Sequence, residues 1–182
     1  MSLGLYLHIP YCFSKCRYCD FYSHPGERGV PEAYVDALLR ELSRFAPEAP
    51  LQPDTLYFGG GTPSLLRPEQ AKRLIDAARP MPGAEITLEA NPETVTEESL
   101  AGFREAGVNR ISFGVQSARD TQLRTLGRPH TAKQARAAFA AARRAGFANI
   151  SGDIMLALPH YTEAEFDETL ELIEGGGATH IS

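Results

Sequence analysis

Apolar residues recur along the chain in short runs that alternate with longer amphipathic segments. The short runs have the length of buried strands, and they cover residues 3–9, 55–58, 85–90, 110–116 and 149–158, with a sixth run opening at 179–182. In the longer segments apolar positions recur at helical spacing, as at Tyr34, Leu38, Leu42 and Phe45. The pattern predicts helices at 31–45, 68–78, 97–106, 120–126, 132–145 and 163–174.

This alternation indicates an α/β protein. Strands that alternate with helices of this length form parallel βαβ units with right-handed crossovers, so a barrel or a doubly wound sheet is expected. We favour a TIM-like (βα) barrel, because barrels place their active-site residues at the carboxyl ends of successive strands. The residues that follow the predicted strands here include the cysteines, Gly60, Gly61, Thr62, Glu89, Gln116 and Asp153. The predicted barrel is partial, truncated after about five to six βα units.

Cysteine occurs at three positions only, Cys12, Cys16 and Cys19, with the spacing C-x3-C-x2-C. Such a loop can turn three thiolates toward one point, which iron-sulfur clusters and zinc both require. A zinc site needs a fourth ligand, for which His8 and His24 are nearest, whereas a 4Fe-4S cluster on three cysteines keeps one iron open. A disulfide would leave one of the three thiols unpaired. Cysteines that only fill the core would be expected to scatter through apolar segments. We favour the cluster, with zinc as the alternative.

Composition and charge narrow the function further. The chain has 182 residues, of which 43% are hydrophobic, enough for one domain with a good core. Its net charge is -5 and both signs are mixed along the sequence, so no basic stripe favours nucleic acid as a partner. The first residues lack the basic flank and long apolar core of a signal peptide, and no apolar run has membrane-spanning length. We therefore expect a cytoplasmic protein.

Several ordered motifs closely resemble the radical S-adenosylmethionine (SAM) superfamily, and more narrowly the oxygen-independent coproporphyrinogen III oxidase family. They lie at residues 6–12, leading into the cysteines, and at 59–64, 89–92, 112–117, 126–131 and 152–155. The resemblance runs along essentially the whole chain. It implies that residues 1–182 form a radical SAM core with an incomplete barrel.

The resemblance also implies the cofactors. Cys12, Cys16 and Cys19 would hold a 4Fe-4S cluster whose open iron chelates the amino and carboxylate groups of S-adenosylmethionine. Electron transfer into the sulfonium would then release a 5'-deoxyadenosyl radical. The cofactor-binding residues carried over from the family are Tyr6, Tyr18, Gly60, Gly61, Thr62, Glu89, Gln116, Arg128 and Asp153.

These residue types suit S-adenosylmethionine. Side-chain-free Gly60 and Gly61 would let the backbone approach the methionine end, and Thr62 adds a hydroxyl donor. A guanidinium such as that of Arg128 can grip a carboxylate with two hydrogen bonds. Carboxylates such as that of Asp153 can accept hydrogen bonds from ribose hydroxyls or from an ammonium group.

The residue two positions after the last cysteine separates two branches of the family. The oxidases typically have a further cysteine there, whereas this chain has Phe21. The stretch 19–23 instead resembles the HemW-type heme-chaperone branch, thought to bind heme and pass it to acceptor proteins. A heme chaperone is therefore the favoured function, and oxidative decarboxylation of coproporphyrinogen III propionates to vinyls is the alternative. Whether the protein is an enzyme stays open.

No heme ligand can be assigned from the sequence. The candidates are His8, His24, His130, His160 and His180, and histidine is a common axial ligand of heme iron. Residues 158–162 depart from the Gly-Gln that usually follows Leu-Pro in the family, which puts that loop in doubt.

The family continues well beyond Ser182, with the rest of the barrel and a C-terminal domain. We therefore expect that this chain lacks the C-terminal remainder. An unpaired strand at a sheet edge favours association, so an open barrel is expected to dimerise, and sedimentation as a monomer at high concentration would contradict this.

Overall fold

The computed structural model describes residues 2–45, 51–158 and 161–182. Within them, six parallel strands form one sheet in the order β1-β4-β5-β6-β7-β8. The strands are β1 (Gly4–Ile9), β4 (Thr55–Gly60), β5 (Glu85–Ala90), β6 (Arg110–Gln116), β7 (Asn149–Ile154) and β8 (His180–Ile181). The strand order follows the chain order, as in successive βαβ units. The predicted α/β class and parallel sheet are confirmed, and the sheet is a partial barrel that does not close.

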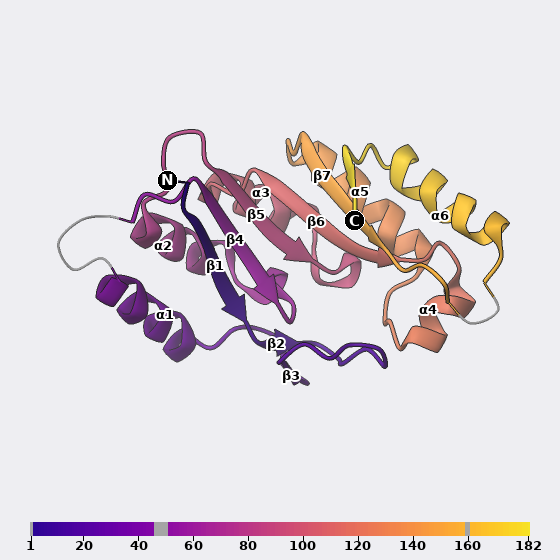
Figure 1. The fold of residues 1–182 in the computed structure, drawn as a ribbon, viewed down its shortest axis with the longest axis horizontal. Helices are drawn as coiled ribbons and strands as arrows, with labels where there is room; N and C mark the ends of the chain where they lie inside the picture. The colour runs from indigo at the N-terminus through magenta and orange to yellow at the C-terminus, as the bar shows by residue number, and fades with distance from the viewer. Residues whose placement is uncertain (1, 46–50, 159–160) are drawn as a thin grey trace.

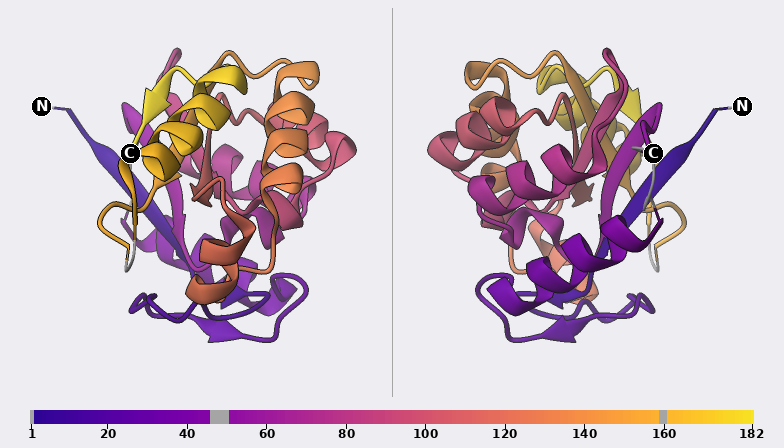
Figure 2. Two further views of the ribbon diagram at one scale, coloured as in Figure 1. Left: turned by 90° about the vertical axis from the view of Figure 1, so that its right-hand side faces the viewer. Right: turned by 90° about the vertical axis from the view of Figure 1, so that its left-hand side faces the viewer.

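The helices other than α4 (Asp120–Leu126) lie along one face of this sheet, and α4 lies near the carboxyl ends of the strands, as two side views also show (Figures 1 and 2). The others are α1 (Glu32–Phe45), α2 (Pro68–Ala78), α3 (Glu97–Ala106), α5 (Ala132–Arg144) and α6 (Glu163–Gly175). Threonine N-caps begin three of them, because the side chains of Thr96, Thr131 and Thr162 each accept a hydrogen bond from the backbone N–H three residues on. All six predicted helices are confirmed to within one residue at their ends.

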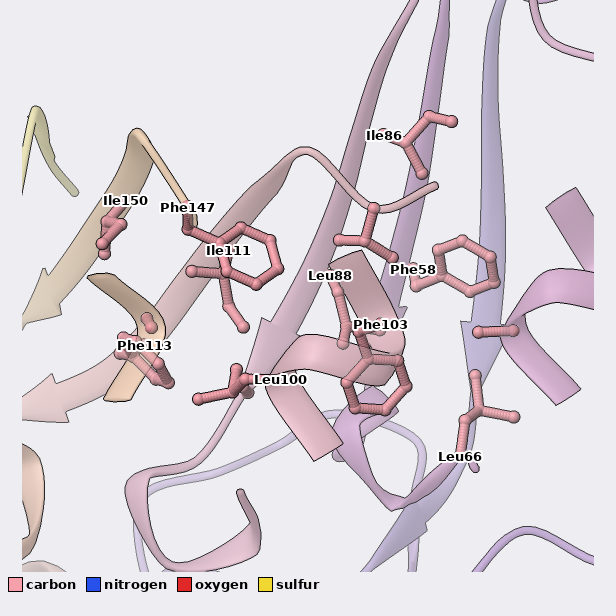
Figure 3. Packing of buried hydrophobic residues seen from close by; sticks show 14 of the residues in the cluster. Phe58, Leu66, Ile86, Leu88, Leu100, Phe103, Ile111, Phe113, Phe147 and Ile150 are labelled. Atoms are coloured by element: carbon pink, nitrogen blue, oxygen red, sulfur yellow. The ribbon is translucent and has the colours of Figure 1, made fainter. Parts of the chain in front are cut away.

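The hydrophobic core lies between the sheet and the helices. Phe58 of β4, Leu88 of β5 and Phe113 of β6 are fully buried and face Phe103 of α3 and other helix residues across this layer (Figure 3). The alternate residues of these strands, such as Glu89, point to the opposite face, because successive side chains of a strand point to opposite sides. The apolar face fixes the register of the strands, and that register brings the polar ends of the strands together.

Strand β7 is shorter than predicted, since the apolar run 149–158 suggested a strand along its whole length. The strand ends at Ile154. The Met155 N–H then donates to the Gln116 carbonyl at 3.1 Å, and Ala157 adopts a left-handed φ of 56°. The hydrogen bond still holds Met155 beside β6, and the left-handed conformation of Ala157 then changes the direction of the chain. Pro159 and His160, which belong to the departing stretch 158–162, lie outside the described residues.

A small second sheet was not predicted. It pairs β2 (Tyr11–Cys12) with β3 (His24–Pro25) in parallel, and it lies beyond the carboxyl ends of β1 and β4 (Figure 1). Two-residue strands have no hydrophobic period, so the sequence offered no signal for them. Their pairing closes the cysteine loop into a compact unit at the active-site end of the sheet.

Candidate cofactor-binding site

A cavity of about 150 Å³ opens at the carboxyl ends of the strands. It is lined by Cys12, Ser14, Lys15, Cys16, Tyr18, Cys19, Phe21, Gly60, Gly61, Thr62, Pro63, Glu89, Ala90, Asn91, Ser112, Gly114, Gln116, Arg128 and Asp153. Every residue that the sequence analysis proposed for cluster or cofactor binding is in this set except Tyr6. The structure therefore brings together groups contributed by the cysteine loop, β4, β5, β6, β7 and the loop after α4.

Backbone hydrogen bonds fasten the cysteine loop on both sides. The Arg17 N–H donates to the Leu126 carbonyl at 2.9 Å, which ties the middle of the loop to the end of α4. The Glu27 N–H donates to the Cys12 carbonyl at 3.1 Å, and the Cys19 N–H donates to the Cys16 carbonyl at 3.2 Å. The loop is thus held in place without any help from a bound group.

The three thiols are free, and Cys12 is buried. Within residues 2–45, 51–158 and 161–182, no three His, Cys, Asp or Glu side chains gather closely enough to hold one metal ion. A 4Fe-4S cluster binds each thiolate at a different iron, so its sulfur ligands lie farther apart than the ligands of a single metal ion. The donor set is also all sulfur, as such clusters require. The three thiols therefore suit such a cluster, and neither His8 nor His24, which the zinc alternative would need as a fourth ligand, gathers with them among the described residues.

The turn after β4 has no room for side chains. A Cβ on Gly61 would lie 2.6 Å from the Tyr11 carbonyl oxygen and 3.0 Å from Cys12 Sγ. Gly60 has a φ of 118°, and its Cβ would lie 2.7 Å from the His8 ring. Glycine permits both the positive φ and the close approach. The bare backbone of residues 60–61 consequently forms one wall of the cavity, directly beside the cysteine loop.

Two carboxyl groups face the cavity, Glu89 from β5 and Asp153 from β7, with β6 between the two strands. Glu89 accepts a hydrogen bond from the Tyr57 hydroxyl at 2.8 Å and another from the Gly60 N–H at 3.2 Å. Asp153 accepts one from the Ser112 hydroxyl at 2.9 Å. Burial raises the pKa of both carboxyl groups, because a low-dielectric surrounding disfavours the charged form. Each is therefore poised to gain from a ligand cation or hydroxyl donor.

Arg128 is the buried cation of the site, with 9% of its surface exposed. Its Nη1 donates to Cys16 Sγ at 3.4 Å, and its Nη2 donates to Asn91 Oδ1 at 2.8 Å and to the Gly114 carbonyl. Its Nε is buried and has no hydrogen-bond partner among the described residues. A buried unpaired donor is costly, so this group suits an anionic ligand.

Tyr18 and Gln116 occupy the edge of the cavity. Burial raises the pKa of the Tyr18 hydroxyl to about 12, with the nearby Arg128 opposing the shift, so this hydroxyl stays neutral. Gln116 adopts a left-handed φ of 67° at the end of β6, a conformation that is uncommon for a residue with a side chain and often found at functional sites. Both line the cavity, and their part in cofactor binding stays a prediction.

Tyr6 lies outside the set that lines the cavity. Its side chain is 54% exposed and stacks on Tyr57, with the two ring centroids 5.9 Å apart. Tyr57 in turn holds Glu89. Tyr6 therefore supports the site through Tyr57 and touches the cavity only indirectly.

The candidate histidines are dispersed. His8 Nε2 lies 2.9 Å from the Tyr22 carbonyl oxygen, His24 is exposed on β3, and His180 is exposed on β8. His130 is buried, and its Nε2 lies 3.2 Å from the Val115 carbonyl oxygen. His160 lies outside the described residues.

One central residue was missed by sequence reasoning. Asn91 follows β5 directly and contacts both Arg128 and Thr62. It belongs to the motif 89–92, so its place beside Glu89 was the available signal. The motif did not indicate which partners its amide would reach.

Comparisons with known proteins agree with this geometry. The family model described as "Radical SAM superfamily" matches residues 6–173. A protein of Haemophilus influenzae named "Heme chaperone HemW" is 39% identical over 94% of this chain and 48% of its own length. An Escherichia coli protein of the same name is 43% identical over 86% of this chain and 43% of its own length.

The coproporphyrinogen III oxidase HemN of Escherichia coli, described as a radical SAM enzyme, superposes with a TM-score of 0.86 at 29% identity. The superposition covers 99% of this chain and 44% of that one. The chain thus spans about half the length of the curated relatives that it matches. None of the helices in the described part of the chain combines the length and apolarity needed to cross a bilayer.

Proposed function

The chain belongs to the radical SAM superfamily, and from this premise we propose that it is the cofactor-binding portion of a heme chaperone. It binds a 4Fe-4S cluster and S-adenosylmethionine in the cavity at the carboxyl ends of its strands. It also takes part in binding heme and in its transfer to an acceptor protein. The observation that supports this best is the convergence of three free cysteines, a bare glycine turn and a buried arginine on one cavity.

The residues that would hold the cluster are Cys12, Cys16 and Cys19. Their loop is fastened to Glu27 and to the end of α4 by backbone hydrogen bonds, so little conformational entropy remains to be lost on binding. When bound, the cluster and S-adenosylmethionine supply electron transfer and radical chemistry. The free thiols also favour a reducing compartment, for which we propose the cytoplasm.

The remaining polar groups match the parts of S-adenosylmethionine. Arg128 supplies a buried cation with an unpartnered Nε for the carboxylate. Glu89, already oriented by Tyr57 and Gly60, accepts from the amino group. Asp153 accepts from the ribose hydroxyls, and the backbone at residues 60–61 lets the ligand approach closely. Tyr18 and Gln116 complete the walls of the pocket.

Heme transfer is preferred to porphyrinogen oxidation because of Phe21. Phe21 is among the residues that line the cavity, it stands where the oxidases typically have a further cysteine, and 66% of its surface is exposed. The relatives named as heme chaperones support the same choice. The structural likeness to a coproporphyrinogen III oxidase favours the alternative enzyme function.

One pair of assays separates the two functions. The full chain is reconstituted anaerobically with iron and sulfide, and heme is titrated while the absorption spectrum is recorded. In parallel, coproporphyrinogen III is incubated with the reduced protein and S-adenosylmethionine, and the porphyrins are analysed by mass spectrometry. A chaperone gives saturable heme binding and leaves the propionates intact. Decarboxylated product without heme binding would overturn the proposal in favour of the oxidase.

A further inference from the structure

Two of the three cysteine sulfurs accept hydrogen bonds from side chains outside the cysteine loop. Thr62 Oγ1 lies 3.6 Å from Cys12 Sγ, and Arg128 Nη1 lies 3.4 Å from Cys16 Sγ. In the described part of the chain, no side chain outside the loop donates to Cys19 Sγ. The three cluster ligands therefore have unequal electrostatic surroundings before any cofactor is bound.

Asn91 connects the two donors. Its Nδ2 donates to Thr62 Oγ1 at 3.1 Å, and its Oδ1 accepts from Arg128 Nη2 at 2.8 Å. The opposite orientation of the amide would place its NH2 group against a guanidinium that can only donate. One side chain at the end of β5 thus holds both donors in place.

Thr62 and Arg128 each keep one donor for a cysteine sulfur. Thr62 has one hydroxyl proton, and its oxygen already accepts from Asn91, so the proton is free to point at Cys12. The Nη2 of Arg128 is used by Asn91 and by the Gly114 carbonyl, which leaves Nη1 for Cys16. Asn91 therefore determines where both donors aim.

The fold leaves room for this network at Gly114. A Cβ at that position would lie 2.8 Å from Arg128 Nη2 and 3.2 Å from Asn91 Oδ1. Any side chain there would push the amide and the guanidinium apart. The contact between Arg128 and Asn91 thus depends on a glycine at position 114 of β6.

Hydrogen bonds to the sulfurs of an iron-sulfur cluster favour its electron-rich reduced form and so tune its reduction potential. We propose that Asn91 is a positioning residue that raises the reduction potential of the cluster by aiming Thr62 at Cys12 and Arg128 at Cys16. This inference rests on the proposed function, because it requires a cluster on the three cysteines. It assigns to Asn91 a role separate from binding S-adenosylmethionine.

The test measures the midpoint potential of the reconstituted full chain by redox titration with electron paramagnetic resonance, in the absence of S-adenosylmethionine. Asn91→Ala removes the contacts to both donors. Asn91→Asp does more, because a carboxylate accepts from Arg128 and also from the Thr62 hydroxyl. The hydroxyl then turns away from Cys12, and the carboxylate adds a negative charge near the cluster. The potential should fall in the order wild type, Asn91→Ala, Asn91→Asp. For Asn91→Asp, about a tenfold lower ratio of reduced to oxidised cluster at fixed potential is expected, which corresponds to about 59 mV for a one-electron couple.

A double-mutant cycle sharpens the test. Thr62→Val should lower the potential in the wild-type background, because it removes the donor to Cys12. In the Asn91→Asp background it should have almost no further effect, because the hydroxyl proton no longer points at sulfur. Equal effects of Thr62→Val in the two backgrounds would contradict the role given to Asn91.

Asn109→Ala is the matched control for the loss of a half-buried amide with two hydrogen bonds. Asn109 bridges the Ile86 N–H and the Ala84 carbonyl, at 2.8 Å each, at the opposite ends of the strands. It should lower stability and leave the potential unchanged. If the wild-type chain takes up no iron and sulfide during reconstitution, the proposed function and this inference are overturned together. An intact cluster with the same potential in Asn91→Asp, or a folded Asn91→Asp variant that holds no cluster, would overturn this inference alone.

Discussion

Adding one methyl group at Gly61 should disrupt the junction between the sheet and the cysteine loop. In Gly61→Ala the new Cβ would lie 2.6 Å from the Tyr11 carbonyl oxygen and 3.0 Å from Cys12 Sγ. The first contact is to backbone and cannot be relieved by a rotamer change. The same carbonyl accepts the Thr62 N–H at 2.7 Å, and the Gly61 N–H donates to the Ile9 carbonyl at 2.9 Å. The loop and the turn must therefore move apart together.

The size of the effect follows from this geometry. Overpacking a well-packed site costs about 1–3 kcal/mol. For a domain of this size each kcal/mol lowers Tm by about 2–4 °C, so Gly61→Ala should lower Tm by about 2–12 °C. Because Cys12 is displaced, the variant should also retain less iron and sulfide after anaerobic reconstitution.

The assay is thermal unfolding of the apoprotein followed by circular dichroism, together with iron and sulfide analysis. Gly175→Ala is the matched control, since nothing lies within 4 Å of its added Cβ at the end of α6. Alanine has the higher helix propensity, so this control should be neutral or stabilising by up to about 1 kcal/mol. A Gly61→Ala variant with wild-type Tm and wild-type iron content would refute the close packing of this turn against the cysteine loop.

Three further predictions concern the walls of the cavity. Asp153→Asn should stabilise the protein more at about pH 7.5 than at about pH 4. Burial raises the pKa of Asp153, so the wild-type protein loses stability as pH rises from the ordinary aspartate range through that raised pKa, whereas asparagine does not titrate. Urea unfolding that gives the same gain at both pH values would contradict this. Arg128→Lys should weaken S-adenosylmethionine binding by about ten- to a hundredfold in calorimetry of the reconstituted protein, since one ammonium group cannot keep the contacts to Asn91 and Gly114 and also replace the unpartnered Nε donor, and unchanged affinity would rule out this role. Phe21→Ser should alter the unfolding free energy by less than about 0.5 kcal/mol, because its ring is 66% exposed, yet it should lower heme affinity in absorption titrations; wild-type heme affinity would count against a role for this ring.

Much of the fold could be predicted from hydrophobic periodicity, because the strands are buried on one face and the helices are long. The runs around Phe58, Leu88 and Phe113 gave the parallel strands, and the polar residues just after them marked the active-site end of the sheet. The same logic placed Glu89 and Asp153 at one cavity before any contact was known.

The remaining features depend on contacts that no local pattern records. Strand β7 ends at Ile154, short of the end of the apolar run, and Met155 contacts Gln116, a residue on another strand. Asn91 matters because its amide meets Thr62 and Arg128, both of which are distant in sequence. Tyr6 supports Glu89 through Tyr57, and only the packing of neighbouring strands determines that arrangement.

The central claim is that the three cysteines hold a cluster with an iron that S-adenosylmethionine can reach. Electron paramagnetic resonance of the anaerobically reconstituted and reduced full chain, recorded before and after addition of S-adenosylmethionine, tests it most directly. The account predicts the signal of a reduced 4Fe-4S cluster that shifts when the ligand is added. A chain that takes up no cluster, or a cluster signal that is indifferent to S-adenosylmethionine, would contradict it.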